Sequence, residues 1–222
     1  MTVSTDPGAA ADAAAPHDGE ETARRSRGPI LAVLALVLGV ALGIGIGLSI
    51  PHFTKPGDDS VEAGFLRDMS THHAQAVEMS MIAHQKSDDA EIVYVANDIA
   101  LTQHGQIGYM QAWLRDWGLS PTGSEPAMAW MPNSAGSIVN GLMPGMATPE
   151  QLTKLRAASG KELNIEFLTL MRQHHLGGIH MAQEAVELSD NKDVDWIAES
   201  MVKSQQTELG LIDDLLKKVQ AS

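Results

Sequence analysis

The sequence has no cysteine, few aromatic residues and a shortage of positive charge. Cysteine is absent from all 222 residues, which excludes a disulfide framework and any thiolate site. Lys and Arg number 15 against 28 Asp and Glu, and the net charge of −13 argues against a nucleic-acid binder, which needs a basic surface. A metal site in this chain would therefore have to use His, Met, carboxylate or amide side chains. Methionine, in contrast, is plentiful, with 12 residues.

The N-terminal part has the pattern of a membrane anchor. Residues 1–28 are rich in Ala, Asp and Glu and end with three arginines, which predicts a disordered acidic tail. Residues 30–50 carry no charge, and as a helix they would span about 31 Å, the thickness of a bilayer core. The preceding arginines predict a cytosolic tail, one transmembrane anchor over 29–51 and an extracytoplasmic remainder. A cleaved secretion signal is the alternative, although no clear Ala-x-Ala site follows.

The chain after the linker at 52–59 contains an internal repeat. A shift of 102 positions without a gap aligns FLRDMSTHHAQAVEMS, from Phe65, with FLTLMRQHHLGGIHMA, from Phe167. A repeat of this size indicates a duplicated supersecondary unit. Because both copies have helical apolar spacing, we predict a domain over 60–222 that is an all-α four-helix bundle. Its two helical hairpins cover 60–117 and 162–220.

Local signals predict where the helices begin. Three acidic pairs are expected to cap the first, second and fourth long helices: Asp59 with Glu62, Asp88 with Glu91, and Asp190 with Asp193. Thr148 followed by Pro149 predicts a short extra helix that ends near Gly160, before a third long helix over 162–188. The connection over 118–161 also contains a long Met-rich loop, and loops of this length are usually functional or disordered.

Both histidine pairs fall on or beside the apolar face of their helices. Folding the first hairpin about residues 87–88 sets His72 level with Gln103 and Met69 level with Gln106. The second hairpin repeats this arrangement with Gln205 and Glu208. A buried polar group without a partner costs about 1–3 kcal/mol. We therefore expect these amides and the carboxylate to pair with the histidines, or with a ligand, across each hairpin.

The combination of imidazole and thioether favours a metal. Neutral imidazole is the commonest metal ligand, and thioether selects Cu(I) and, by extension, Ag(I). A Met-x-x-His spacing, which makes the two side chains neighbours on a helix, occurs three times. The candidate ligands are Met69, His72, His73, Met79, His84, Met171, His174, His175 and Met181. The residues expected to orient the imidazoles are Gln103, Gln106, Gln205 and Glu208.

The same pattern also fits a structural polar layer. In that interpretation the histidines pair with the amides and fix the register of the bundle, and the methionines are packing residues. The methionines of the connecting loop are hydrophobic anchors or additional Cu(I) ligands.

The repeated motifs resemble the bacterial domain-of-unknown-function family numbered three hundred and five. The resemblance covers about residues 60–220 and includes MPGMATPEQLTKLRAASG before the second repeat. It implies a ferritin-like four-helix bundle with Met-x-x-His-His in each half, typically secreted or membrane-anchored. At least one family member is associated with copper binding and copper resistance. Met69, His72, His73, Met79, Met171, His174, His175 and Met181 match the motif as candidate metal residues, while Gln106 stands where the second half has Glu208.

These observations predict a membrane-anchored, extracytoplasmic protein that binds Cu(I) or Ag(I) for copper sequestration, tolerance or delivery. We expect no catalytic residues and no enzymatic activity. The expected partners are the membrane and an envelope protein that accepts the metal, and a homo-oligomer is compatible with the sequence. One alternative is a non-metal interaction module in which the Met-rich loop contacts a membrane complex. Another is a ferritin-like di-metal oxidoreductase, which needs Glu-x-x-His pairs that this sequence lacks.

Overall fold

The computed structural model describes residues 28–132 and 134–221. Its helices are α1 (Gly28–Thr54), α2 (Val61–Lys86), α3 (Ala90–Asp116), the 3₁₀ turn η1 (Ser134–Gly136), α4 (Pro149–Ala157), α5 (Gly160–Leu188) and α6 (Lys192–Ala221). No β-strand forms in these described residues, where an isolated bridge joins Val139 and Leu142. The predicted all-α fold is confirmed. The chain divides between Phe53 and Thr54 into two compact units, which are described separately.

Helix α1 is a single apolar helix. Within it, Ile30–Leu48 has a mean hydropathy of 2.7, and none of this stretch is buried. Its length and composition fit a membrane crossing, and a signal sequence near the N-terminus would have the same properties. The predicted acidic tail falls almost entirely in residues 1–27, which lie outside the described residues.

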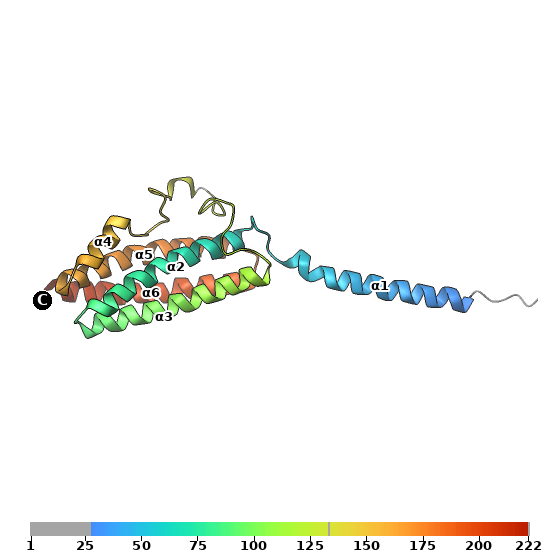
Figure 1. The fold of residues 1–222 in the computed structure, drawn as a ribbon, viewed down its shortest axis with the longest axis horizontal. Coiled ribbons are helices and arrows are strands. Elements are labelled where there is room, and N and C mark those ends of the chain that lie inside the picture. Colours follow the sequence, from blue (N-terminus) through green and yellow to red (C-terminus); the bar gives the residue numbers. More distant parts are fainter. Residues whose placement is uncertain (1–27, 133, 222) are drawn as a thin grey trace, which may run out of the picture. The chain divides into compact units, whose positions relative to one another are not determined.

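The second unit is built on the four long helices α2, α3, α5 and α6, and it also contains α4 (Figure 1). Helix α2 packs along α3, and α5 packs along α6, so each copy of the repeat is a helical hairpin. The two hairpins meet mainly through α2 and α5, while α3 and α6 touch much less. The predicted four-helix bundle made of two repeated hairpins is therefore confirmed. Figure 1 also shows the connecting loop and α4 lying along the α2 and α5 side of the bundle.

The bundle interior consists of two hydrophobic clusters with a polar layer between them. One cluster contains Met79 and Met171, and the other contains Met69 and Met181. On α2 the histidine pair lies between Met69 and Met79, and on α5 the second pair lies between Met171 and Met181. Each Å² of apolar surface that these clusters bury stabilises the bundle by roughly 25 cal/mol. Because a cluster packs on each side of the polar layer, this packing fixes the position of the layer in the bundle.

Three helix caps lie one residue after the predicted positions. Ser60, Asp89 and Asn191 accept hydrogen bonds from the first backbone N–H groups of α2, α3 and α6, in place of the predicted Asp59, Asp88 and Asp190. Ser, Asp and Asn are all good N-caps, so neighbouring candidates cannot be ranked by residue type alone. The predicted capping box between Thr148 and Gln151 is confirmed. Helix α5 begins at Gly160, two residues before the predicted start.

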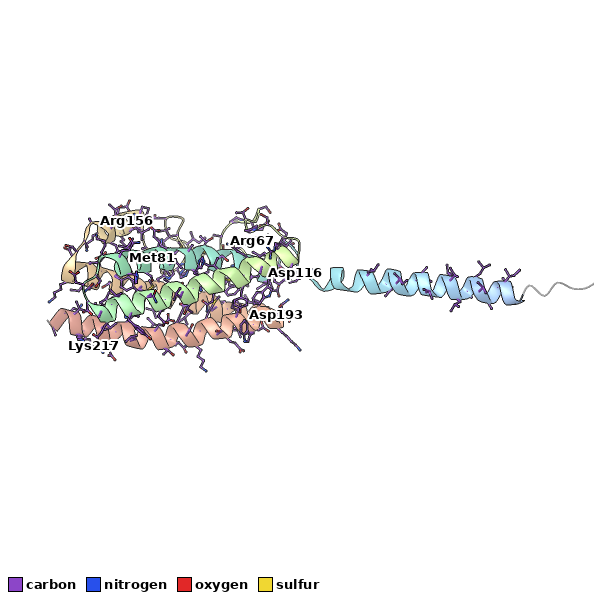
Figure 2. All side chains as sticks on the ribbon, turned by 60° about the horizontal axis from the view of Figure 1, so that its bottom comes forward. Arg67, Met81, Asp116, Arg156, Asp193 and Lys217 are labelled. Atoms are coloured by element: carbon purple, nitrogen blue, oxygen red, sulfur yellow. The ribbon has the colours of Figure 1, made fainter. Side chains whose placement is uncertain are left out.

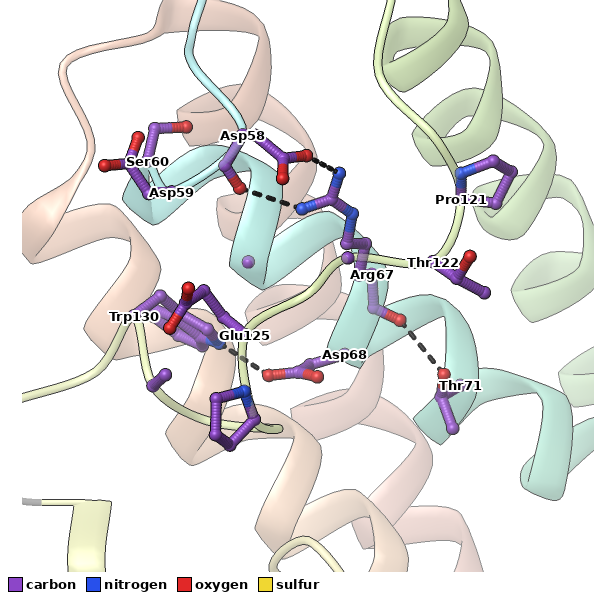
Figure 3. A pocket seen from close by; sticks show the side chains of 14 residues that line it. Asp58, Asp59, Ser60, Arg67, Asp68, Thr71, Pro121, Thr122, Glu125 and Trp130 are labelled. Carbon is purple, nitrogen blue, oxygen red and sulfur yellow. Dashed lines mark hydrogen bonds and ion pairs between the residues drawn. The ribbon is translucent and has the colours of Figure 1, made fainter.

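Two residues of α2 fasten the start of the connecting loop to the bundle (Figure 3). The Arg67 guanidinium donates to the Ser120 carbonyl oxygen (3.0 Å) and to the Asp58 carbonyl oxygen (2.9 Å). Asp68 Oδ2 accepts from the Met128 backbone N–H (2.6 Å) and from Trp130 Nε1 (2.8 Å). Arg67, Asp68 and Trp130 line a surface pocket, and the guanidinium of Arg67 is already hydrogen-bonded to the chain itself. We therefore assign this pocket a structural role.

The methionines of the loop point into the protein. Met128, Met131 and Met143 are buried, and Met146 is half-buried against the same hydrophobic cluster. In this arrangement they anchor the loop to its own bundle. They are not available as the adhesive surface that the interaction-module alternative requires.

Candidate metal centre

All four repeated histidines are fully buried in the polar layer. His72 and His73 come from α2, His174 and His175 come from α5, and each has 0% exposure. Their position in the middle of long helices follows from the register of the apolar face, which places them between the two hydrophobic clusters. Four neighbouring imidazoles without solvent contact are uncommon in the core of a helical bundle, where Leu and Ile usually lie.

His72 and His174 meet at the interface between the two hairpins. Their ring centroids lie 3.7 Å apart with an interplanar angle of 34°. His174 Nε2 lies 2.9 Å from the backbone oxygen of His72, and His72 Nε2 lies 3.0 Å from the backbone oxygen of Pro144. A carbonyl oxygen only accepts hydrogen bonds, so each Nε2 carries the proton and donates it. In the neutral ring, the lone pair is then on Nδ1.

His73 and His175 are held by side chains of the second helix of each hairpin. His73 Nε2 donates to Gln106 Oε1 (2.7 Å), and His175 Nε2 donates to Glu208 Oε2 (2.6 Å). Pairing of histidines with Gln106 and Glu208 across each hairpin was expected, but folding the hairpins set these two residues level with Met69 and Met171 rather than with His73 and His175. Glu208 is only 12% exposed, so its carboxylate lies at the edge of the layer rather than in open solvent.

Several polar atoms of the layer have no hydrogen-bond partner. The Nδ1 atoms of all four histidines are buried and unpaired, and so are both amide atoms of Gln103 and Gln205. The expected pairing of these two glutamines with histidines is not seen, because His72 and His174 donate to backbone carbonyls instead. Most buried polar groups in proteins are hydrogen-bonded, so a concentration of unpaired atoms in one layer calls for a functional explanation.

Gly178 provides room for this group of side chains. A Cβ atom at this position would lie 2.7 Å from Gln205 Oε1 and 3.3 Å from His72 Cε1. The equivalent residue of the first repeat is Ala76, so the two halves of the layer are not identical in shape.

His72, His73 and His174 are neutral at pH 7 because burial lowers the pKa of each. Burial lowers the pKa of His72 to about 4 and that of His73 to about 3. Burial also lowers the pKa of His174 well below its ordinary value, and the neighbouring imidazoles add to the effect. A neutral imidazole is the form that can offer a lone pair to a metal ion.

The candidate methionines are divided between the two sides of the layer. Met69 and Met181 lie on one side, Met79 and Met171 lie on the other, and all four are fully buried. His84 is exposed near the end of α2, and its partner Met81 is 41% exposed (Figure 2). The structure therefore brings together eight of the nine candidate ligands around one layer and leaves His84 apart from them.

The layer is not a ready-made cage of His and carboxylate side chains. Across residues 28–132 and 134–221, no three His, Asp or Glu side chains are grouped so that they could hold a metal ion. An ion in this layer would have to use Nδ1 atoms together with thioether or amide groups.

Sequence reasoning missed the segment that closes one side of the layer. Residues 143–147 (Met-Pro-Gly-Met-Ala, here called the strap) bring the Pro144 carbonyl oxygen to His72. The strap is fastened by Gln75 and passes closely over Gly177. One feature of the sequence could have indicated this segment: Gln75 and Gly177 occupy equivalent positions in the two repeats, but one has a long side chain and the other has none.

Comparison with known proteins places the chain in a family. The family model described as "Domain of unknown function (DUF305)" matches residues 62–216. The chain belongs to the DUF305 family. The predicted resemblance is confirmed. None of the curated proteins compared with the chain matches it.

Solved structures of DUF305 proteins have the same fold. A protein from Streptomyces coelicolor, described as "putative secreted protein DUF305", is 43% identical, with a TM-score of 0.68 over 74% of this chain and 96% of its own. A DUF305 fragment from Deinococcus radiodurans is 26% identical, with a TM-score of 0.59 over 71% of this chain and 96% of its own.

The fold is also similar to that of CopM. CopM in its Cu(II)-bound form is 23% identical, with a TM-score of 0.54 over 74% of this chain and 99% of CopM. CopM has also been solved in Cu(I)-bound and Ag-bound forms. At these identities the likeness establishes a common fold.

Proposed function

We propose that this DUF305 protein binds copper as Cu(I) in the buried histidine layer, and that Ag(I) can take its place. The observation that carries the proposal is the set of four buried Nδ1 atoms without a hydrogen-bond partner. Each imidazole is held through Nε2, so all four offer the same ring atom. A ring whose other nitrogen donates a hydrogen bond is the usual arrangement of a metal-ligating histidine.

The chemistry of the layer fits a soft monovalent ion. The four candidate methionines are as fully buried as the histidines and flank them along the helices. Thioethers and imidazoles together favour Cu(I), whereas Mg²⁺ and Ca²⁺ prefer oxygen ligands. The Cu- and Ag-bound forms of CopM, a protein of the same fold, support this choice of metals.

The N-terminal helix supports a location at a membrane. With α1 as a single-pass anchor and the arginines on the cytosolic side, the bundle would lie outside the cytoplasm. Soft ligands without thiols suit an oxidising compartment, where cysteine would form disulfides. We propose that the protein sequesters Cu(I) there or delivers it to an acceptor protein of the envelope.

A Cu(I) competition titration tests the proposal. The full chain in detergent micelles is compared with a variant in which His72, His73, His174 and His175 are all changed to Gln. We expect tight binding by the parent chain and at least about a 100-fold loss in the variant, because loss of the buried imidazoles leaves few nitrogen ligands. Circular dichroism of both proteins establishes that the variant is folded.

A second variant provides the matched control. His84, His104 and His180 are exposed histidines of the same bundle, and changing all three to Gln removes surface imidazoles only. Binding should be retained. If the surface variant lost Cu(I) binding and the variant without the four buried histidines kept it, the metal would lie on the surface and the proposal would be rejected.

A second candidate function is an interaction module with its contact surface on the aromatic side chains of α3 and α6. Tyr109 and Trp196 are each 55% exposed, and their rings lie 6.1 Å apart. Aromatic residues are enriched at protein interfaces. A chain that binds no Cu(I) but loses a co-purifying envelope protein on Tyr109→Ala and Trp196→Ala substitution would favour this function.

A further inference from the structure

We infer that Gln75 and Gly177 are positioning residues of the histidine layer: they hold the strap so that its Pro144 carbonyl fixes His72 with the proton on Nε2 and the lone pair on Nδ1. The inference rests on the proposed function where it concerns metal affinity. The contacts themselves are properties of the chain without metal, and they can be tested without it.

Gln75 clamps the strap at both backbone groups of one residue. Its Nε2 donates to the Ala147 carbonyl oxygen (2.9 Å), and its Oε1 accepts from the Ala147 N–H (2.7 Å). Both side-chain polar groups are used, so the amide is fixed in orientation as well as in place. The clamp lies on α2 one turn after His72, whose ring reaches the same strap.

Gly177 lets the strap approach α5. A Cβ atom on this residue would lie 1.9 Å from the Pro144 oxygen and 2.4 Å from its carbonyl carbon. Real structures do not tolerate such distances, so any larger residue would push the strap away. Gly145 makes the matching approach from the strap: it has φ of +78°, and a Cβ there would lie 2.3 Å from the Gln173 oxygen.

The contacts of His72 and Gly177 meet at one atom of the strap, while Gln75 holds the strap three residues further on, at Ala147. The Pro144 carbonyl oxygen lies 3.0 Å from His72 Nε2, and it is the atom that a Cβ on Gly177 would meet first. His72 in turn supplies the backbone oxygen that receives the His174 Nε2 proton. The strap therefore determines directly which nitrogen of His72 is free, and it supports the backbone to which His174 is bonded.

Gln75 and Gly177 occupy equivalent positions in the two repeats, and both contact the strap. The shift of 102 positions that relates the repeats pairs Gln75 with Gly177. The strap occurs once, so it breaks the symmetry of the layer. The first repeat binds it through the Gln75 amide, and the second repeat leaves space for it at Gly177. A purely internal packing role would not require opposite sizes at equivalent positions.

The test reads the tautomer of His72 in the metal-free protein. The full chain is labelled with ¹⁵N-histidine in detergent micelles, and long-range ¹H–¹⁵N spectra at pH 7.5 show which ring nitrogen carries the proton. We expect His72 to be protonated at Nε2 alone. Gln75→Ala and Gly177→Ala should each give a mixture of tautomers and lower Cu(I) affinity by about 10–100-fold, the usual effect of losing a hydrogen-bond partner of a ligand.

Two matched controls carry the same chemical changes away from the strap. Gly108→Ala adds a Cβ in open space on α3, and Gln85→Ala removes an exposed amide near the end of α2. Both should keep the parent tautomer and affinity. Circular dichroism checks that every variant is folded, and Gln75→Ala keeps the test valid if Gly177→Ala fails to fold.

The outcomes separate the two proposals. A single Nε2–H tautomer in both strap variants would overturn the positioning role, as would a parent chain with His72 protonated at Nδ1. Shifted tautomers with unchanged Cu(I) affinity would overturn the link between the strap and the metal. Shifted tautomers in a protein that binds no Cu(I) would uphold the positioning role and reject the proposed function.

Discussion

His73 and His175 occupy equivalent positions in the two repeats, yet His73 donates to a neutral amide and His175 donates to a carboxylate. The Gln106 oxygen lies 2.7 Å from Nε2 of His73, and the Glu208 oxygen lies 2.6 Å from Nε2 of His175. A carboxylate partner makes an imidazole a stronger electron donor than an amide partner does. The two halves of the layer should therefore differ in metal affinity.

Exchanging these partners should change the affinity in opposite directions. Glu208→Gln makes the second half resemble the first and should weaken Cu(I) binding by about 10-fold. Gln106→Glu should strengthen it. Competition titrations of the two variants and of the double exchange measure the effect. Equal affinities in all four proteins would mean that these side chains do not influence the ion.

The stability of the bundle should fall in acid because of the buried histidines. The pKa values of His72 and His73 are lowered to about 4 and about 3, while an unfolded histidine titrates near 6.5. Between these values the unfolded chain binds more protons than the folded one. The contribution of these two neutral histidines to the free energy of unfolding is therefore complete above pH 6.5. It is lost as the pH falls toward the folded-state pKa values of about 4 and about 3, by up to about 1.4 kcal/mol per pH unit for each histidine.

Urea unfolding of residues 55–222 at pH values from 7.5 to 4.5 measures this slope. Replacing His73 by Leu removes one group that binds a proton in the unfolded chain but not in the folded one. The free energy of unfolding should then depend less steeply on pH. The same replacement at exposed His84 is the control and should leave the slope unchanged. A parent protein equally stable at pH 7.5 and 4.5 would contradict neutral burial of the histidines.

Removing the Asp68 carboxylate should loosen the connecting loop. Asp68 Oδ2 receives two hydrogen bonds, from the Met128 backbone and from the Trp130 indole. Asp68→Ala leaves these donors without their partner and should lower the free energy of unfolding by about 1–3 kcal/mol. Urea unfolding measures the loss, and limited proteolysis should show faster cleavage within residues 118–132. Glu125→Ala, an exposed carboxylate of the same pocket, should have little effect.

Replacing buried methionines by leucine can separate packing from ligation. Met69→Leu and Met171→Leu conserve the volume of the core and should cost less than about 1.5 kcal/mol of stability. Leu has no sulfur, so a methionine that binds the ion should show a loss of Cu(I) affinity much larger than the loss of stability. Met110→Leu, a buried methionine of the same bundle outside the repeat motif, is the control. Unchanged affinity in both test variants would assign these methionines to packing alone.

The repeat explains why so much of the bundle could be predicted from the sequence. An alignment without gaps at a shift of 102 positions, together with helical apolar spacing, implies two equivalent hairpins. Folding each hairpin at its short turn correctly predicts that Gln106 and Glu208 pair with histidines across the hairpin, although it sets them level with Met69 and Met171 and not with His73 and His175. The chemistry inside one hairpin is local enough to be read from spacing.

The strap could not be predicted because its contacts are distant in the chain. Gln75 meets Ala147 and His72 meets Pro144 across 72 residues, and no periodicity connects these positions. The prediction that Gln103 and Gln205 pair with histidines failed for the same reason, since backbone carbonyls of the strap and of His72 take the protons. The one-residue errors in three caps have a local cause, because adjacent residues were equally good caps.

The complete burial of the four imidazoles has a kinetic consequence. An ion held by atoms with no solvent contact can exchange only when the helices or the strap move apart. Its residence time would then be governed by the opening rate of the protein rather than by the strength of the metal–ligand bonds. Such a carrier would release its cargo slowly to free chelators, and quickly only to a partner able to open the bundle.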